Sequence, residues 1–264
     1  MAFKFCSIAS GSSGNCQYIE GGKGKILVDA GLSGKRIQES LNSIGANSGN
    51  IDGILVTHEH KDHIKGVGIL SRRFDIPIYA NNNTWEVMRE YLGKLKEENI
   101  RIIKNNDTFE IKDIGISTFK TSHDAIDSMG YTLNYRNKKI SIVTDTGIIT
   151  DEIKNEIKNS DLLMLESNHD VDMLKVGSYP YYLKKRVLSS SGHLSNEDAG
   201  NLIVDIFQDK FKKIFLGHLS KENNFPELAY QTVVNIISEK GIKINKDVEI
   251  DIANRHQPTV LCKI

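Results

Sequence analysis

The stretch THEHKDHIKG, residues 57–66, limits the possible fold more than any other part of the chain. Three histidines, a glutamate and an aspartate occupy the six positions from His58 to His63. The helical zinc motif H-E-x-x-H does not match, because Asp62 stands where the second histidine is required. On an extended chain, residues two apart share a face, so His58 and His60 can bind one ion. Left unpaired, these groups would repel one another and would be costly to desolvate. We therefore expect a metal site, with Asp62 and His63 directed toward a second ion.

The residues on either side of the motif predict where it lies in the fold. A short apolar run at 54–56 ends at Thr57 and predicts a strand. After His63, apolar residues recur at positions 64, 67 and 70, which is helical spacing and predicts a helix to about Phe74. The motif should therefore lie at a turn from a strand into a helix.

Composition excludes several classes of protein. Lys+Arg and Asp+Glu both number 34 in the 264 residues, so a nucleic-acid partner would need a local basic patch. Cys6, Cys16 and Cys262 form no C-x-x-C pair and are typical of free thiols in a reducing compartment. No apolar stretch is long enough for a signal peptide or a membrane span, so we expect a cytoplasmic protein without a membrane partner.

Strands and helices alternate along the whole chain, which predicts one α/β domain over 1–264 with a sheet-on-sheet core covered by helices. The predicted strands are residues 3–10, 16–20, 25–31, 54–57, 76–80, 100–104, 108–111, 115–120, 131–135, 140–145, 161–166, 212–217 and 248–253. Three predicted helices span residues 63–74, 151–159 and 226–239. Three others are predicted from their caps: one after Ser33 that runs to Leu41, one from a capping box at Asn83 to about Lys96, and one that begins at Asn196.

Three further candidate ligands stand where predicted strands end. His123 follows the strand GISTFK, Asp145 ends ISIVTD, and His218 follows KKIFLG. Taken singly, a strand-end histidine or aspartate is more often a hydrogen-bonded turn residue. Because side chains at one end of a sheet converge, we expect these three to join the 58–63 cluster.

The H-x-H-x-D-H run and the segment ILVDAG at 26–31 together resemble the metallo-β-lactamase superfamily. The resemblance implies a four-layer αββα sandwich with the metal site at one edge of the two-sheet core. It also implies two divalent ions, with Zn²⁺, Mn²⁺ and Fe as the candidates, with Asp145 bridging them and Asp29 orienting a ligand without binding metal. The implied ligands are His58, His60 and His123 for one ion, and Asp62, His63 and His218 for the other.

Other segments resemble the phosphodiesterase branch, in which an acidic residue and a later histidine pass a proton to the leaving oxygen. Glu166 and His193 stand in the corresponding places, although His193 could instead merely pack beside the Ser195 helix cap. SGSSGNC, LESNHD, SGHLSNEDA and GHLSKENN together resemble the YycJ/WalJ subfamily. That resemblance implies a 5′-to-3′ DNA exonuclease linked to mismatch repair, in which Asp62 holds the attacking hydroxide. It assigns no role to His169.

Substrate contacts and competing functions stay open at this stage. Ser12, Ser13 and Asn15 could donate hydrogen bonds to a phosphate, or the SGSSGN segment could be a simple hairpin turn. Lys184, Lys185 and Arg186 lie in YPYYLKKR and could bind DNA, or they could form a solvated face. A small-molecule hydrolase, acting on a cyclic phosphodiester, thioester or lactone, and a metal-binding accessory or signalling protein are the alternatives. The sequence predicts no oligomeric state.

Overall fold

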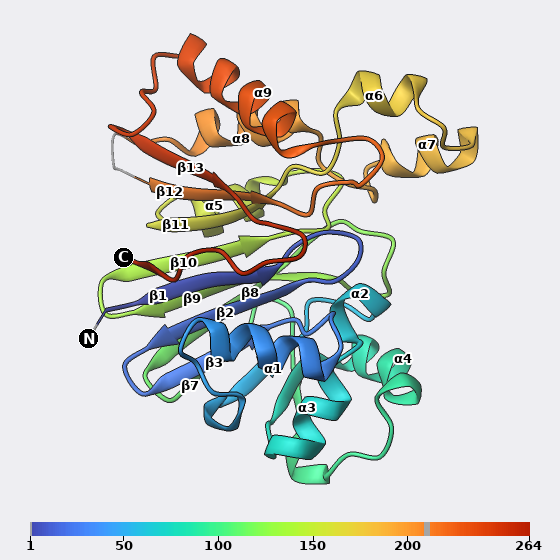
Figure 1. The fold of residues 1–264 in the computed structure, drawn as a ribbon, viewed down its shortest axis with the longest axis vertical. Helices are drawn as coiled ribbons and strands as arrows, with labels where there is room; N and C mark the ends of the chain where they lie inside the picture. The colour runs from blue at the N-terminus through green and yellow to red at the C-terminus, as the bar shows by residue number, and fades with distance from the viewer. Residues whose placement is uncertain (1, 209–211) are drawn as a thin grey trace.

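A computed structural model describes residues 2–208 and 212–264 and arranges their strands in two facing sheets (Figure 1). From edge to edge the first sheet contains β14 (Cys262–Lys263), β1 (Lys4–Ala9), β2 (Cys16–Gly21), β3 (Gly24–Val28), β4 (Gly53–Leu55), β5 (Ile78–Asn81) and β6 (Ile100–Ile103). The second contains β13 (Val248–Ile252), β12 (Lys212–Gly217), β11 (Leu162–Glu166), β10 (Lys138–Val143), β9 (Met129–Tyr135), β8 (Ile114–Lys120) and β7 (Thr108–Ile111).

Helices cover the outer faces of both sheets. Those belonging to the first sheet are α1 (Gly34–Ser43), α2 (Lys61–Ile64), α3 (Val67–Phe74) and α4 (Asn82–Leu92), with short 3-10 turns at Ser48–Asn50 and Glu97–Asn99. Those of the second half are α5 (Asp151–Ile157), α6 (Val171–Val176), α7 (Tyr181–Val187), α8 (Asn196–Ile206) and α9 (Pro226–Glu239). Figure 1 shows α6 and α7 extending past the end of the second sheet, away from α8 and α9.

The alternation of side chains along each strand produces the layers. In β3, Ile26 and Val28 pack into the core between the sheets, whereas Leu27 packs beneath the helices. In β11, Met164 faces the second sheet's inner core and Leu163 faces α8 and α9. Burial on both faces accounts for the nearly continuous apolar strands. The predicted four-layer αββα sandwich is confirmed.

Two helix predictions were wrong at their boundaries. The predicted helix 63–74 is two helices, because the Gly66 N–H bonds to Ala30 O at 2.7 Å instead of continuing the helical pattern. A Cβ at Gly66 would come within 2.5 Å of Leu32 O, so glycine permits this close approach. The helix predicted from Asn83 to Lys96 is capped instead by Asn81, and it ends at Leu92.

Three short elements were not predicted from the sequence. They are α6, α7 and the two-residue β14. Ser33 and Ser195 cap α1 and α8 as expected, and α9 spans the predicted residues. Among the described residues, no helix combines the length and apolar character that crossing a membrane would require.

Candidate metal centre

The seven predicted ligands come from strand ends of both sheets and meet at one edge of the sandwich. His58, His60, Asp62 and His63 lie in the connection from β4 through α2, and His123, Asp145 and His218 follow β8, β10 and β12. Among the described residues, four groups have one candidate ligand atom per residue within 4.8 Å of the others. Two of them, His58, His60 and His123, and Asp62, His63 and His218, coincide with the two predicted sets. The other two are His58, His63 and Asp145, and Asp145, Glu166, His193 and His218.

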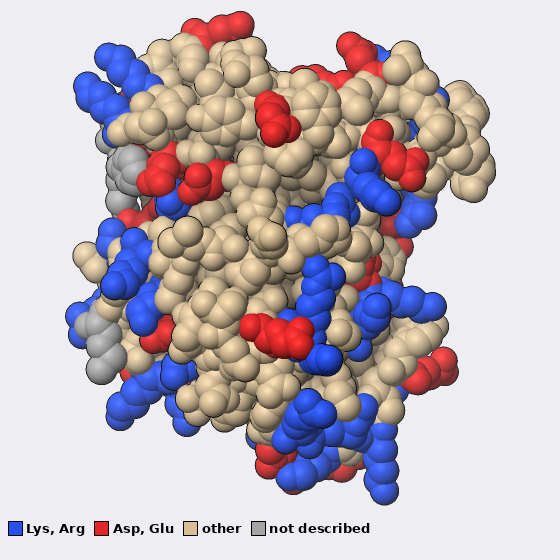
Figure 2. Space-filling model, viewed as in Figure 1, with Lys and Arg blue, Asp and Glu red and all other residues tan. Residues whose placement is uncertain are grey.

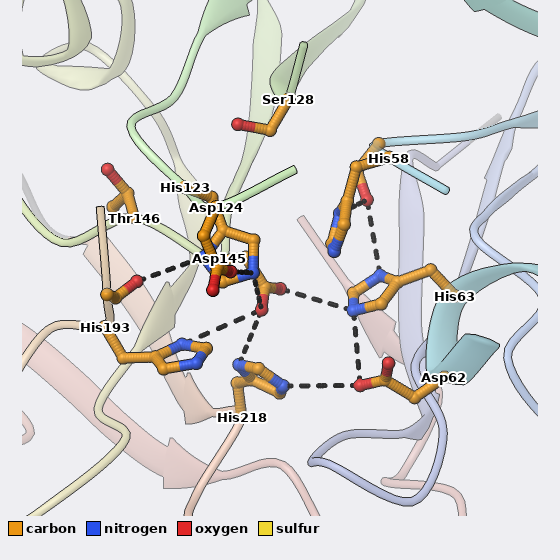
Figure 3. A network of polar contacts seen from close by, with 12 residues as sticks. His58, Asp62, His63, His123, Asp124, Ser128, Asp145, Thr146, His193 and His218 are labelled. Atoms are coloured by element: carbon orange, nitrogen blue, oxygen red, sulfur yellow. Dashed lines mark hydrogen bonds and ion pairs between the residues drawn. The ribbon is translucent and has the colours of Figure 1, made fainter. Parts of the chain in front are cut away.

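Asp145 lies between the two groups (Figure 3). Its Oδ2 is 3.4 Å from His63 Nε2, and its Oδ1 is 3.7 Å from His123 Nε2 and 3.3 Å from His218 Nδ1. Asp145 therefore lies near histidines of both groups, which is the position that a bridging ligand requires.

Unpartnered buried atoms test whether this donor set fits a metal. His58 Nε2, His218 Nε2 and Asp145 Oδ2 are buried and have no hydrogen-bond partner among the described residues. Orphaned polar atoms of this kind are costly inside a protein, and a cation satisfies them. Imidazole and carboxylate groups are the donors that Zn²⁺ and similar ions take. The fold and these clusters therefore indicate divalent-metal binding.

The backbone at the strand ends is also unusual. Asp29, Asp145 and His218 have φ values of 59°, 56° and 53°, in the left-handed region that non-glycine residues seldom adopt. Each such residue costs of the order of 1–3 kcal/mol, and such residues cluster at functional sites. The folded chain thus holds a strained backbone at the positions that turn these side chains toward the centre.

Asp29 contacts His63, one of the ligands that the resemblance implies. Its carboxylate accepts from His63 Nδ1 at 2.7 Å, and from the N–H and Oγ1 of Thr57 at 2.9 Å each. With Nδ1 held by Asp29, the Nε2 lone pair of His63 faces the centre. Asp29 is buried and belongs to neither ligand group.

Asn15, one of the predicted phosphate contacts, lies beside Asp62 and His63. It is buried, and its Nδ2 lies 3.0 Å from His63 Nε2 and 3.3 Å from Asp62 Oδ2. Its Oδ1 accepts from Gly11 N at 2.8 Å, which closes the loop between β1 and β2 against α2. Gly31 allows this packing, because a Cβ there would lie 1.6 Å from Asp62 O.

The buried carboxylates give the centre a negative potential. Burial alone would lower the pKa of His218, but Asp145, Asp62 and Glu166 raise it to about 10. Burial likewise opposes the charged form of His63, and Asp29 and Asp145 nevertheless raise its pKa. Burial and the neighbouring His63 lower the pKa of His58. A potential that attracts protons to histidines also attracts a divalent cation.

Glu166 joins the centre to His193. This fully buried carboxylate accepts from His193 Nδ1 at 2.7 Å and from His218 Nδ1 at 2.9 Å. Burial alone would raise the pKa of Glu166, but His193 and His218 lower it. Burial opposes the charged form of His193, but Glu166 outweighs it and raises the pKa of that ring. The contact with His218 was not predicted from the sequence.

A cavity of about 240 Å³ opens onto the centre. Asp62, His193 and Ser12 contribute to its lining, and α7 contributes Leu183 and Arg186. Arg186 is paired with Asp124, whose Oδ1 is 3.2 Å from His123 Nε2. Asp124 was not among the predicted site residues, although it directly follows His123 in the sequence.

The remaining predicted substrate residues lie outside this lining. Ser13 is exposed, Lys184 donates to Lys175 O at 2.7 Å, and Lys185 lies 4.8 Å from the Tyr181 ring centre. His169, which had no predicted role, is buried, and neither ring nitrogen has a partner among the described residues. Burial lowers the pKa of His169 to about 4.

Comparison with known proteins agrees with this fold. The family description "Beta-lactamase superfamily domain" matches residues 25–213. The chain is 42% identical over 259 residues to exodeoxyribonuclease YycJ of Bacillus anthracis, covering 98% of both chains. It is 42% identical over 266 residues to exodeoxyribonuclease WalJ of Streptococcus pneumoniae, covering 100% of this chain and 99% of the relative.

The solved structure of YhfI from Bacillus subtilis, a metallo-beta-lactamase fold protein, superposes with a TM-score of 0.75. It covers 98% of this chain and 100% of its own at 16% sequence identity, so this likeness concerns the fold alone. The family match and the two full-length relatives show more than the fold. Because of them, the chain belongs to the metallo-β-lactamase superfamily, in the branch of YycJ and WalJ, and is a metal-dependent hydrolase.

Proposed function

We propose that the protein is a phosphodiester hydrolase that removes nucleotides from DNA in the 5′-to-3′ direction. Two relatives that match over the full chain carry the name exodeoxyribonuclease. The observation that carries the proposal within this structure is the hydrogen bond from His193 to buried Glu166 at the cavity wall.

Two divalent ions, Zn²⁺ or Mn²⁺ with Fe as a third candidate, complete the proposed centre. We assign His58, His60 and His123 to one ion and Asp62, His63 and His218 to the other, with Asp145 between them. When bound, the ions supply hydroxide at neutral pH and neutralise phosphate oxygens as negative charge shifts.

His193 is proposed as the general acid. Its Nδ1 is engaged by Glu166, and its side chain keeps 20% of its surface exposed beside the cavity. The Nε2 atom is therefore the one available to donate a proton, and it protonates the departing 3′ oxygen. Glu166 stabilises the protonated ring and fixes its orientation.

Asp62 is proposed to position the attacking water. Its Oδ2 lies 3.5 Å from His63 Nε2 and 3.8 Å from His218 Nε2, so it faces both rings. The side chain is 26% exposed and lines the cavity, which leaves it accessible to a water molecule. Ser12 and Arg186 share that lining and are proposed to contact the phosphate.

The direct test offers metal-loaded protein 5′-phosphorylated duplex DNA, single-stranded DNA, RNA and a nitrophenyl phosphodiester. We expect 5′-mononucleotides to be released from DNA. His193→Ala should slow DNA cleavage by about 10²–10⁴-fold. The nitrophenyl substrate should be affected much less, because its leaving group needs no proton. Glu166→Gln should show the same selectivity, whereas Glu20→Gln, a carboxylate paired with Lys4 on β1, is the matched control.

Two outcomes would contradict the proposal. Equal loss on both leaving groups would mean that His193 holds structure and not a proton. Turnover of small cyclic phosphodiesters, thioesters or lactones with none on DNA would favour the small-molecule hydrolase instead.

We further propose that the chain is a single-domain cytoplasmic protein linked to DNA repair. The cysteines support a reducing compartment, because Cys6, Cys16 and Cys262 are all free. The mutation rate of a strain lacking the gene tests the repair role, and a rate equal to that of the parent would refute it.

A further inference from the structure

A basic surface adjoins the metal centre on the side of the cavity away from α7. It consists of Arg36, Lys61, Lys65 and Tyr91, and we call it the α2 surface. Lys61 and Lys65 are exposed, Arg36 is half-buried, and Tyr91 is 60% exposed. Figure 2 shows Lys and Arg side chains gathered over this part of the molecule, where Figure 1 places α1, α2 and α3.

Covalent and hydrogen-bonded links hold this surface next to the centre. Lys61 begins α2 and Lys65 caps its end, so the two flank Asp62 and His63 in sequence. The N–H of Ala30 bonds to His63 O at 2.8 Å, and the Gly66 N–H bonds to Ala30 O at 2.7 Å. These bonds place the start of α1, with Arg36, beside the end of α2.

No cation of the α2 surface forms an ion pair with a described residue, although exposed Glu86 and Glu90 lie on α4 with Tyr91. Within residues 30–74, all of which the structure describes, Glu39 is the one exposed acid, and it lies 3.8 Å from Lys35. Lys65 makes no ion pair with any described residue. Arg36 donates to His256 O at 3.1 Å, a contact that leaves its charge in place.

Tyr91 supplies a second, independent feature. It is on α4, and Lys61 Nζ lies 5.8 Å from its ring centre. An exposed aromatic ring among cations is the combination that binds unpaired bases and phosphates together.

Two cations of α7 are engaged within the protein. Lys184 donates to Lys175 O and Arg186 is paired with Asp124, whereas Lys185 lies over exposed Tyr181 much as Lys61 lies over Tyr91. Only a local patch can attract a polyanion to a chain whose formal net charge is +0.

We propose that the DNA backbone leading to the metal centre runs across the α2 surface, with its phosphates on Arg36, Lys61 and Lys65 and an unpaired base on Tyr91. This inference rests on the proposed function, because it concerns the path of the same substrate. Lys184 and Lys185 contribute little to this path.

The test measures DNA binding by fluorescence anisotropy at several salt concentrations, with His193→Ala as the common background so that the DNA stays intact. The double variant Lys61→Gln/Lys65→Gln should lower the slope of log K against log salt by about 1.8 for duplex or about 1.4 for single strands, since each phosphate contact contributes about 0.9 or 0.7. The control Lys243→Gln/Lys246→Gln removes the same charge before β13, at the opposite end of the strands from His218.

Further variants separate the parts of the surface. Tyr91→Ala should weaken single-strand binding about fivefold or more with little change in slope. Lys184→Gln/Lys185→Gln should behave like the control pair. If the Lys61/Lys65 pair behaves like the control while Lys184/Lys185 shows the reduced slope, the proposed path is wrong and α7 binds the backbone.

The same measurements distinguish this inference from the proposed function. If the unaltered chain cleaves DNA and the Lys61/Lys65 pair leaves the slope unchanged, the α2 surface alone is refuted. If the unaltered chain neither binds nor cleaves DNA but hydrolyses the nitrophenyl substrate, the DNA assignment itself fails. Hydrolysis of the nitrophenyl substrate by the Lys61/Lys65 variant should stay within about twofold, since that substrate has no neighbouring phosphates for these lysines to contact.

Discussion

Replacing Asp29 with asparagine tests how the centre is held ready for metal. The change keeps the size of the side chain, and asparagine tolerates the left-handed backbone that Asp29 adopts at φ 59°. It removes the negative charge that accepts from His63 Nδ1 at 2.7 Å. An amide nitrogen facing Nδ1 would favour the ring form whose proton is on Nε2, the atom that faces the centre.

The magnitude follows from the number of contacts that change. Loss of a partner that orients a metal-binding histidine typically costs 10–100-fold in metal affinity, or about 1.4–2.8 kcal/mol. The new amide oxygen could still accept from one of the two Thr57 donors, both 2.9 Å from Asp29, so we expect the fold to survive. The metal-free protein should lose about 1–3 kcal/mol of unfolding free energy, because a buried charged hydrogen bond is broken.

The assay is a competition between the protein and a chromophoric chelator, read as metal dissociation constants for Zn²⁺ and Mn²⁺. The matched control is Asp52→Asn, which changes a carboxylate that accepts from Lys25 N at 2.9 Å on the first sheet. We expect the control to bind metal like the unaltered chain. Metal affinity of the Asp29→Asn variant within twofold of the unaltered protein would refute the orienting role.

Three further predictions concern stability. Gly31→Ala should lower the free energy of unfolding by about 1–3 kcal/mol, because the new Cβ would clash with Asp62 O. Gly115→Ala is the control and should be tolerated, since a Cβ there would lie 3.9 Å from its nearest neighbour. Denaturant midpoints compare the two variants, and equal midpoints would contradict the packing argument. Ser195→Ala should lower the free energy of unfolding by about 1 kcal/mol, since it removes the reciprocal cap with Asp198 on α8. An unchanged denaturant midpoint would show that the cap does not stabilise the fold. Removing metal with a chelator should lower the melting temperature. Metal at a free concentration of 100 times its Kd stabilises the folded state by about 2.7 kcal/mol, and the chelator removes this contribution. A melting temperature that does not change with metal would contradict the proposed centre.

Local spacing was sufficient for much of this protein. His58 and His60 could be paired from the sequence because two-residue spacing on an extended chain places both side chains on one face. The positions of His123, Asp145 and His218 after apolar runs placed them at strand ends, and the alternating strands and helices led to the layered fold that the structure confirms. The roles of these residues remain predictions, although the structure brings all of them together.

Contacts between distant segments could not be predicted in the same way. Nothing near Asn15 in the sequence indicates that its amide lies 3.0 Å from His63, or that Glu166 contacts His218 as well as His193. Such contacts depend on how two sheets and their loops pack, because a few ångströms of relative displacement would break them while leaving every local pattern intact. The direction in which each cation points is also decided by the tertiary structure. YPYYLKKR is one basic run in the sequence, but on the helix α7 Arg186 lines the cavity while Lys184 and Lys185 do not. The reason is that successive helical residues point about 100° apart.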